Sequence, residues 1–219
     1  MKIKSLLFFL PALALLASCG DAPQGPQGEE YETYILNFNS SYVARSNSES
    51  SGFKAAMLSY INHDAEIASE VTINAENYIN IYGKSDSDVK RLILGSATKA
   101  GEMIISFKTK LVSLKIEAQA QYSSYNRTWD EYDDEGQLKP KGYIINNDNT
   151  ANKVYINGSA WDLNYGNYGE VVYQSQADLD SHLPEIKTNE FQINSNSLSL
   201  KGFAKERAQI YKLEFKVVK

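Results

Sequence analysis

Cysteine, histidine and clusters of basic residues are scarce in this chain of 219 residues, and each shortage excludes a class of function. Cys19 is the single cysteine, so no disulfide can form within the chain. The two histidines, His63 and His182, have no further ligand residue at metal-binding spacing, which argues against a histidine-centred metal or catalytic site. Lys and Arg number 22 against 27 Asp and Glu and form no cluster, so we expect no nucleic-acid partner.

Motifs of catalysis are missing as well. The sequence has no G-x-S-x-G nucleophile elbow, and the glycine-flanked segment 95–101 lacks the Gly-Lys-Ser/Thr of a phosphate-binding loop. Nothing singles out a pair of carboxylates for glycoside hydrolysis among the 27 acids. We therefore expect no catalytic residue and no enzyme, and a glycan hydrolase acting outside the cytoplasm is the alternative.

The N-terminus has the layout of an export signal. A basic start precedes an apolar run over residues 6–17, which is shorter than the roughly 20 residues that cross a bilayer. The run ends in Leu16-Ala17-Ser18-Cys19, which resembles the lipobox of bacterial lipoproteins. The resemblance implies that residues 1–18 are a signal peptide and that Cys19 carries lipid, which anchors the chain to a bilayer at the cell surface or the periplasmic face. An ordinary secretory signal with a chance cysteine is the alternative.

The residues after Cys19 change in composition. Residues 21–30 are rich in Pro, Gly and Gln and have no apolar periodicity, so 19–30 is expected to be a lipidated, flexible tether. Residues 31–219 are long enough for one domain with a sizeable core.

The exported part has the composition of an all-β protein. Tyr is abundant, with 15 residues, and Asn, Ser and Gly supply turns. Over residues 111–121 apolar and polar residues alternate strictly, which predicts a strand with one solvated face in an antiparallel sheet. We expect an antiparallel, jelly-roll-like β-sandwich over residues 31–219. One short helix is predicted near 53–61, where an irregular strand is the alternative.

The predicted strands are short and separated by turns. Asn157-Gly158 predicts a tight hairpin between two of them. Residues 123–152, apart from one short strand at 142–145, are expected to form a polar, acidic insert, and 165–184 an irregular stretch. The strands are predicted at 31–38, around 71–73 and 79–81, and at 89–94, 102–107, 111–121, 153–156, 159–163, 190–193, 197–200 and 209–217.

Four segments resemble, in the same order, an accessory β-sandwich module that recurs in bacterial secreted and surface proteins. The resemblance implies a jelly-roll-like sandwich and export, and it implies no defined activity. This chain departs from the module by the long insert at 123–152. The matching segments are residues 90–107, 110–122, 153–163 and 206–215.

Aromatic residues in the irregular segments are the candidate ligand-binding residues. Rings beside polar groups stack on sugars, as aromatic faces do on other ligands. Packing of the loops onto the sandwich explains the same rings and is the alternative. The candidates are Tyr125, Trp129 and Tyr132 in the insert, with Tyr165 and Tyr168 in the later segment.

The insert also carries carboxylates that are a weak candidate for Ca²⁺. Asp130, Asp133 and Asp134 offer hard oxygen ligands, but their spacing is not that of an EF-hand. A solvated acidic loop is the preferred interpretation, and no cofactor is expected. The sequence thus predicts a membrane-anchored, non-catalytic lipoprotein that binds a glycan or a surface protein, with a purely structural envelope component as a further alternative.

Overall fold

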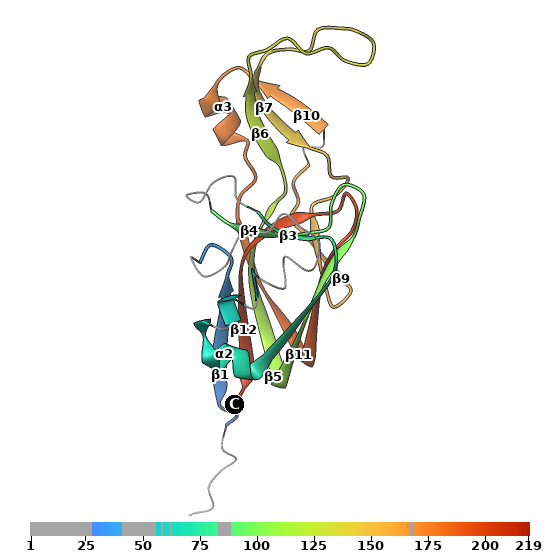
Figure 1. Ribbon diagram of the computed structural model, residues 1–219. Coiled ribbons are helices and arrows are strands. Elements are labelled where there is room, and N and C mark those ends of the chain that lie inside the picture. Colours follow the sequence, from blue (N-terminus) through green and yellow to red (C-terminus); the bar gives the residue numbers. More distant parts are fainter. Residues whose placement is uncertain (1–27, 41–55, 58, 62, 83–88, 167–168) are drawn as a thin grey trace, which may run out of the picture.

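The computed structural model describes residues 28–40, 56–57, 59–61, 63–82, 89–166 and 169–219 (Figure 1). The predicted signal peptide, Cys19 and Tyr168 lie outside these residues. The described part is mostly β, with two antiparallel sheets of nine and three strands and only short helices. None of the helices found there has the length and the apolar character that a membrane crossing requires.

The two sheets use different parts of the chain. The large sheet contains β1 (Tyr31–Asn37), β2 (Val71–Asn77), β3 (Ile79–Tyr82), β4 (Arg91–Leu94), β5 (Gly101–Ala120), β8 (Lys153–Ile156), β9 (Ser159–Asp162), β11 (Lys187–Gly202) and β12 (Ala208–Val218). The small sheet contains β6 (Ser123–Arg127), β7 (Gly142–Asn147) and β10 (Gly169–Tyr173). The named helices are α2 (Ala65–Glu70) and α3 (Gln176–Ser181).

The large sheet has the order β3-β4-β12-β5-β11-β8-β9, with β1 beside β12 and β2 beside β5. The 20-residue β5 changes partners along its length, because residues 101–107 pair with β2 and residues 111–120 pair with β12. β11 pairs with β5 along both halves. The Phe107 ring on the first half of β5 lies 5.3 Å from the Phe215 ring on β12. The two halves of the sheet therefore enclose a common apolar core.

Apolar and polar residues alternate along residues 111–121, and the apolar face of β5 packs into this core. Leu114, Ile116 and Ala118 are fully buried. Burial of a large aliphatic side chain contributes about 1.5–3 kcal/mol relative to exposure, so rows of such residues along β5, β11 and β12 hold the large sheet together. The polar face of β5 is partly covered as well, since Gln119 is buried and donates through Nε2 to the Pro184 carbonyl at 2.5 Å.

Short helices cover the large sheet before β2. Of the helix predicted at 53–61, the described residues 56–57 and 59–61 are helical, and Met57 and Ile61 are buried. α2 begins after Asp64, whose Oδ1 accepts from the backbone N–H groups of Glu66 and Ile67, each at 3.2 Å. An N-cap of this kind satisfies N–H groups that have no partner inside the helix.

The small sheet has the order β10-β7-β6 and stands beyond one end of the large sheet (Figure 1). α3 packs on it and begins at the N-cap Ser175, which accepts from the Asp178 N–H at 3.1 Å. Ile145, Tyr173 and Leu179 form a second apolar cluster between the sheet and this helix. The strand predicted at 142–145 corresponds to β7, whereas β6, β10 and α3 lie in segments expected to be irregular.

Two pairs of predicted strands are single strands in the structure. β5 continues through Lys108–Lys110, and β11 continues through residues 194–196, where the register to β5 shifts and Asn194 has a φ of 53°. A bulge accommodates extra residues within a strand, so polar residues at these positions interrupt the pattern without ending the pairing. The hairpin predicted at Asn157-Gly158 is confirmed, with φ of 48° and 83°.

Tyr155 on β8 gives an expectation for alkaline stability. Its hydroxyl donates to the Glu206 carboxylate, and this bond, together with burial, raises the pKa of Tyr155 to about 12 from 10.0. Between these values the folded chain keeps a proton that the unfolded chain loses, so the contribution to stability is complete below pH 10 and falls as pH rises toward 12. Between pH 10 and 12, the unfolding free energy of Tyr155→Phe, measured with urea, is expected to fall less than that of the unchanged protein.

Glu206→Gln is the second variant for this test, because it removes the carboxylate and keeps the tyrosine. Its loss of stability with pH is expected to lie between those of the unchanged protein and Tyr155→Phe. An unchanged dependence in Tyr155→Phe contradicts the link between this hydrogen bond and alkaline stability.

Candidate functional site

The connection between β6 and β7 forms an ordered hairpin at the far end of the small sheet. The Lys139 N–H donates to the Glu131 carbonyl at 2.7 Å, and Tyr132 forms a β-bridge with Leu138. The Gly136 N–H closes the turn by donating to the Asp133 carbonyl at 3.0 Å. Residues 128–141, called the tip hairpin below, therefore present their side chains from a defined backbone.

Arg127, the last residue of β6, fixes the base of the tip hairpin. Its side chain is fully buried, and Nε and Nη2 donate to the Pro140 carbonyl at 3.0 and 2.7 Å. Nη2 also donates to Glu170 on β10 at 2.8 Å, and Nη1 donates to Glu131 at 3.4 Å. One guanidinium thus links both arms of the tip hairpin to the small sheet, and its planar set of donors suits this geometry.

Hydrogen bonds favour the charged forms of Arg127 and Glu131 under the tip hairpin. The hydrogen bond to Glu170 raises the pKa of the Arg127 guanidinium. Lys139 donates to Glu131 at 2.8 Å, and this bond lowers the pKa of the Glu131 carboxyl. The network of these four residues is therefore held by charge-assisted hydrogen bonds.

Two of the predicted ring residues meet on the face of this network. Tyr125 and Trp129 stack with centroids 6.0 Å apart and an interplanar angle of 14°. The Tyr125 hydroxyl donates to Glu170 at 3.1 Å, and burial and this bond raise the pKa of Tyr125. Trp129 is 52% exposed and Tyr132 is 61% exposed. Tyr125 is thus held in place by Glu170, whereas Trp129 and Tyr132 are open to solvent.

Tyr165, the remaining described ring candidate, lies in a different environment. It is half-buried, and its hydroxyl donates to the His182 carbonyl at the end of α3 at 3.2 Å. Its own carbonyl accepts from Asn152 Nδ2 at 3.2 Å. Tyr165 is therefore held against α3, whereas Tyr125 and Trp129 belong to β6 and the tip hairpin. Tyr168 lies outside the described residues.

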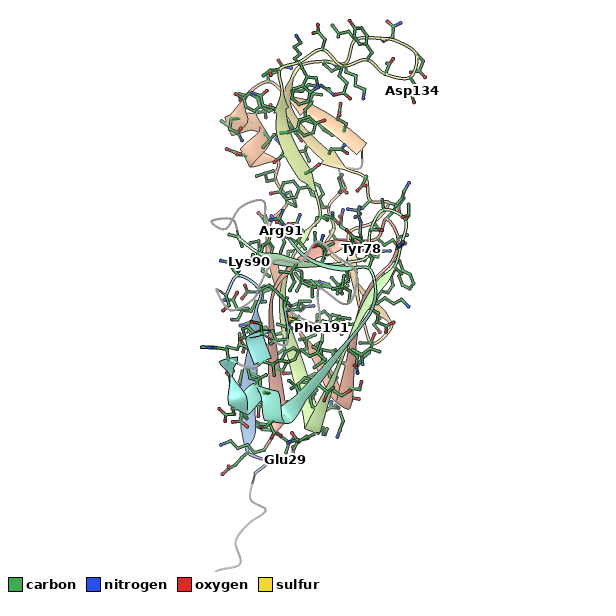
Figure 2. All side chains as sticks on the ribbon, in the orientation of Figure 1. Glu29, Tyr78, Lys90, Arg91, Asp134 and Phe191 are labelled. Carbon is green, nitrogen blue, oxygen red and sulfur yellow. The ribbon has the colours of Figure 1, made fainter. Side chains whose placement is uncertain are left out.

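Two of the three aspartates considered for Ca²⁺ have separate local partners. Asp130 pairs with Lys141 at 2.6 Å, and the Asp133 carboxylate accepts from the backbone N–H groups of Glu135 and Gln137 at 3.1 and 2.7 Å. Asp134 is exposed at the end of the molecule opposite Glu29 (Figure 2). Across residues 28–219, masked positions aside, no group of three or more His, Cys, Asp or Glu side chains is placed to hold a metal.

A polar cavity of about 260 Å³ lies where the large and small sheets meet, and sequence reasoning did not find it. It is bounded by β3, β4, the start of β12 and the link between β5 and β6. Arg207 and Gln209, both buried, contribute to its wall. Its lining residues come from remote parts of the chain, so no local sequence pattern marks the cavity. The lining side chains are those of Tyr78, Asn80, Arg91, Ile93, Gln121, Tyr122, Ser123, Ser124, Arg207 and Gln209.

No family model matches this chain, and neither a curated protein nor a solved structure matches it significantly.

Proposed function

We propose that this protein is an exported lipoprotein, anchored to a membrane through acylated Cys19, that binds a glycan with its tip hairpin. The observation that carries the proposal is the half-exposed Trp129 indole stacked on Tyr125 above charged hydrogen-bonding groups. A sugar ring presents C–H groups to an aromatic face and hydroxyls to its rim, so an aromatic ring bordered by polar groups suits it. No catalytic role is proposed.

The position of the tip hairpin supports presentation away from a bilayer. The chain enters β1 next to the C-terminus, where the Lys219 N–H donates to the Glu30 carbonyl at 2.9 Å. Figure 2 places Glu29 at one end of the molecule and Asp134, in the tip hairpin, at the other. An anchor that precedes Glu29 therefore holds the aromatic residues at the far end.

The finer fold proposal is a jelly-roll-like sandwich related to the accessory module of bacterial surface proteins. The four resembling segments fall on β4 with the start of β5, on the second half of β5, on the β8–β9 hairpin, and on β12. All of these strands are in the large sheet, whereas β6 and β7 of the small sheet lie in the insert that the module lacks. This division is consistent with a ligand-binding attachment on a sandwich scaffold.

Contact with a surface protein is the second candidate, and one observation favours it. Leu138 is 55% exposed beside the Tyr132 backbone. The central part of a protein interface is more apolar than the rest of the surface and is enriched in aromatic residues, so Leu138 beside Tyr132 suits such a contact.

A glycan array and a cell-wall polysaccharide pull-down with the full chain in detergent test the proposal. Trp129→Ala and Tyr132→Ala are expected to weaken binding of the selected glycan by about tenfold each, because a ring contact is worth about 0.5–1.5 kcal/mol beyond its buried area. Isothermal titration with the selected glycan measures the change.

Tyr31→Ala is the matched control, since Tyr31 is 42% exposed and lies on β1 at the other end of the molecule. It is expected to bind like the unchanged protein. If the folded protein binds no glycan, or if both tip variants bind as well as the control, the tip hairpin is not a sugar site, and protein contact becomes the function to test.

A further inference from the structure

The polar cavity between the two sheets has the composition of a ligand site. Residues from β3 and β4 line one side, and the link from β5 to β6 lines another. Figure 2 shows Tyr78 and Arg91 at the end of the large sheet that faces the small sheet. A second hollow of about 220 Å³ shares Gln121, Tyr122, Ser123 and Arg207 with the first. The site therefore lies at the junction that positions the small sheet.

Two guanidinium groups, those of Arg91 and Arg207, line the cavity. Arg207 is buried and held in place, since its Nε donates to Asn149 Oδ1 at 2.8 Å and its Nη2 to Asp148 at 2.7 Å. Burial raises the pKa of Tyr122, and the positive charge of Arg91 partly offsets this effect. The positive charge of Arg91 therefore acts on Tyr122, which also lines the cavity. Guanidinium groups in a polar, sheltered cavity favour a carboxylate.

Two amide oxygens in the cavity wall lack hydrogen-bond donors. Asn80 Oδ1 and Gln121 Oε1 are buried and have no partner within the part of the chain that the structure describes. Buried acceptors without a donor cost free energy, and most buried polar atoms in proteins are paired. A ligand with hydroxyl groups supplies the donors that these two oxygens need.

We propose that this cavity binds one small polyhydroxylated carboxylate of the size of a hexuronic acid. The carboxylate accepts from the guanidinium groups of Arg91 and Arg207, and ring hydroxyls donate to the amide oxygens of Asn80 and Gln121. The volume suits a single sugar ring, because sites for larger, drug-sized molecules occupy about 300–1,000 Å³. The proposal does not depend on glycan binding by the tip hairpin, which uses other residues.

The carboxylate and the hydroxyls of this ligand match different groups of the cavity. A neutral sugar forms no charge-assisted hydrogen bond with the guanidinium groups, and acetate leaves the two amide oxygens without donors. A ligand at this position also contacts both the large sheet and the link to β6. Binding is therefore expected to slow amide exchange in residues 121–124 as well as to release heat.

Isothermal titration of the full chain in detergent with glucuronate, glucose and acetate tests the ligand class. Glucuronate is expected to bind saturably and at least about tenfold more tightly than either comparison compound, since it makes hydrogen bonds that each of them lacks. Absence of saturable glucuronate binding, or equally tight binding of glucose, overturns the proposal.

The double variant Asn80→Leu/Gln121→Met tests the two amide oxygens. Both replacements keep approximate volume and remove an acceptor that has no donor in the free protein. Glucuronate affinity is expected to fall by about tenfold, while the urea midpoint stays the same or rises. A merely structural role gives the opposite pattern, with a lower midpoint and unchanged affinity.

Asn189→Leu/Gln192→Met is the matched control, because both residues are exposed on β11 outside the cavity. It is expected to bind glucuronate like the unchanged protein, and an equal loss of affinity in this control overturns the assignment. Trp129→Ala separates the two sites: it is expected to leave glucuronate binding unchanged even where it abolishes glycan binding by the tip hairpin.

Discussion

Replacing Gly202 by alanine is expected to lower the free energy of unfolding by about 3 kcal/mol, at the upper end of the usual cost of overpacking. A Cβ at Gly202 would lie 2.1 Å from the Leu94 carbonyl oxygen and 2.9 Å from its carbonyl carbon. Both atoms belong to the backbone at the end of β4, so no side-chain rotation relieves the contact. Urea unfolding followed by circular dichroism measures the change.

Gly101 faces Gly202 across β5 and β11 and is expected to behave in the same way. A Cβ there would lie 1.9 Å from the Tyr78 carbonyl oxygen, which also accepts from the Gly95 N–H at 2.8 Å. The two glycines thus let the backbone of Tyr78 and Leu94 lie directly against the start of β5 and the end of β11. Because Tyr78 lines the polar cavity, Gly101→Ala is also expected to weaken glucuronate binding.

Gly166→Ala is the control for this pair. A Cβ at Gly166 meets no heavy atom within 4 Å among the residues described, so its effect is expected to stay within about 0.5 kcal/mol. Equal stability of Gly202→Ala and Gly166→Ala contradicts the close approach of β4 to β11.

The parts of the fold that the sequence predicts are those with a local cause. Residues 111–121 alternate because β5 has one face in the core, and periodicity of two is visible without knowledge of the partner strands. Asn157 and Gly158 both adopt positive φ, which few residue types tolerate. The dipeptide Asn-Gly therefore predicts the hairpin turn from sequence alone.

The continuity of β5 and β11 is not visible in the sequence. The polar residues 108–110 and 194–196 are typical of turns, yet both segments stay in the sheet. The residues that flank 108–110 pair with strands far away in the chain, since β5 pairs with β2 up to Phe107 and with β12 from Leu111. Long-range pairing overrides local preference, because the backbone hydrogen bonds of the neighbours are satisfied only there.

The small sheet shows the same limit more strongly. β6 has the sequence SSYNR, which is polar enough for a loop, and β10 begins with Gly169 and Glu170. Buried positions in this sheet include Arg127, which donates to Glu170, and Asn147, whose Oδ1 accepts from Asn149 Nδ2. The aromatic residues of the tip hairpin are recognisable in the sequence as candidates. Their exposure depends on the buried Arg127 side chain, which holds the backbone beneath them, and the sequence does not show this contact.

Arg127→Met is therefore expected to loosen the small sheet and leave the large sheet intact. The change removes a fully buried guanidinium and leaves Glu170 and the Pro140 carbonyl without this donor. Removal of one partner from a buried ion pair is strongly destabilising, because the remaining charge stays desolvated. Amide exchange in β6, β7 and β10 is expected to accelerate by about a hundredfold, with no change in β5 or β11.

Lys141→Met is the matched control, because it also removes a cation from an ion pair with a carboxylate. Lys141 and Asp130 are 50% and 59% exposed, and exposed pairs contribute little. Its exchange rates are expected to match those of the unchanged protein. If Arg127→Met exchanges like Lys141→Met, the buried network does not hold the tip hairpin. Arg127→Met keeps Trp129. If this variant exchanges faster and also binds glycan more weakly, the position of the Trp129 ring depends on the Arg127 guanidinium. Arg127 then sets the binding geometry without touching the sugar.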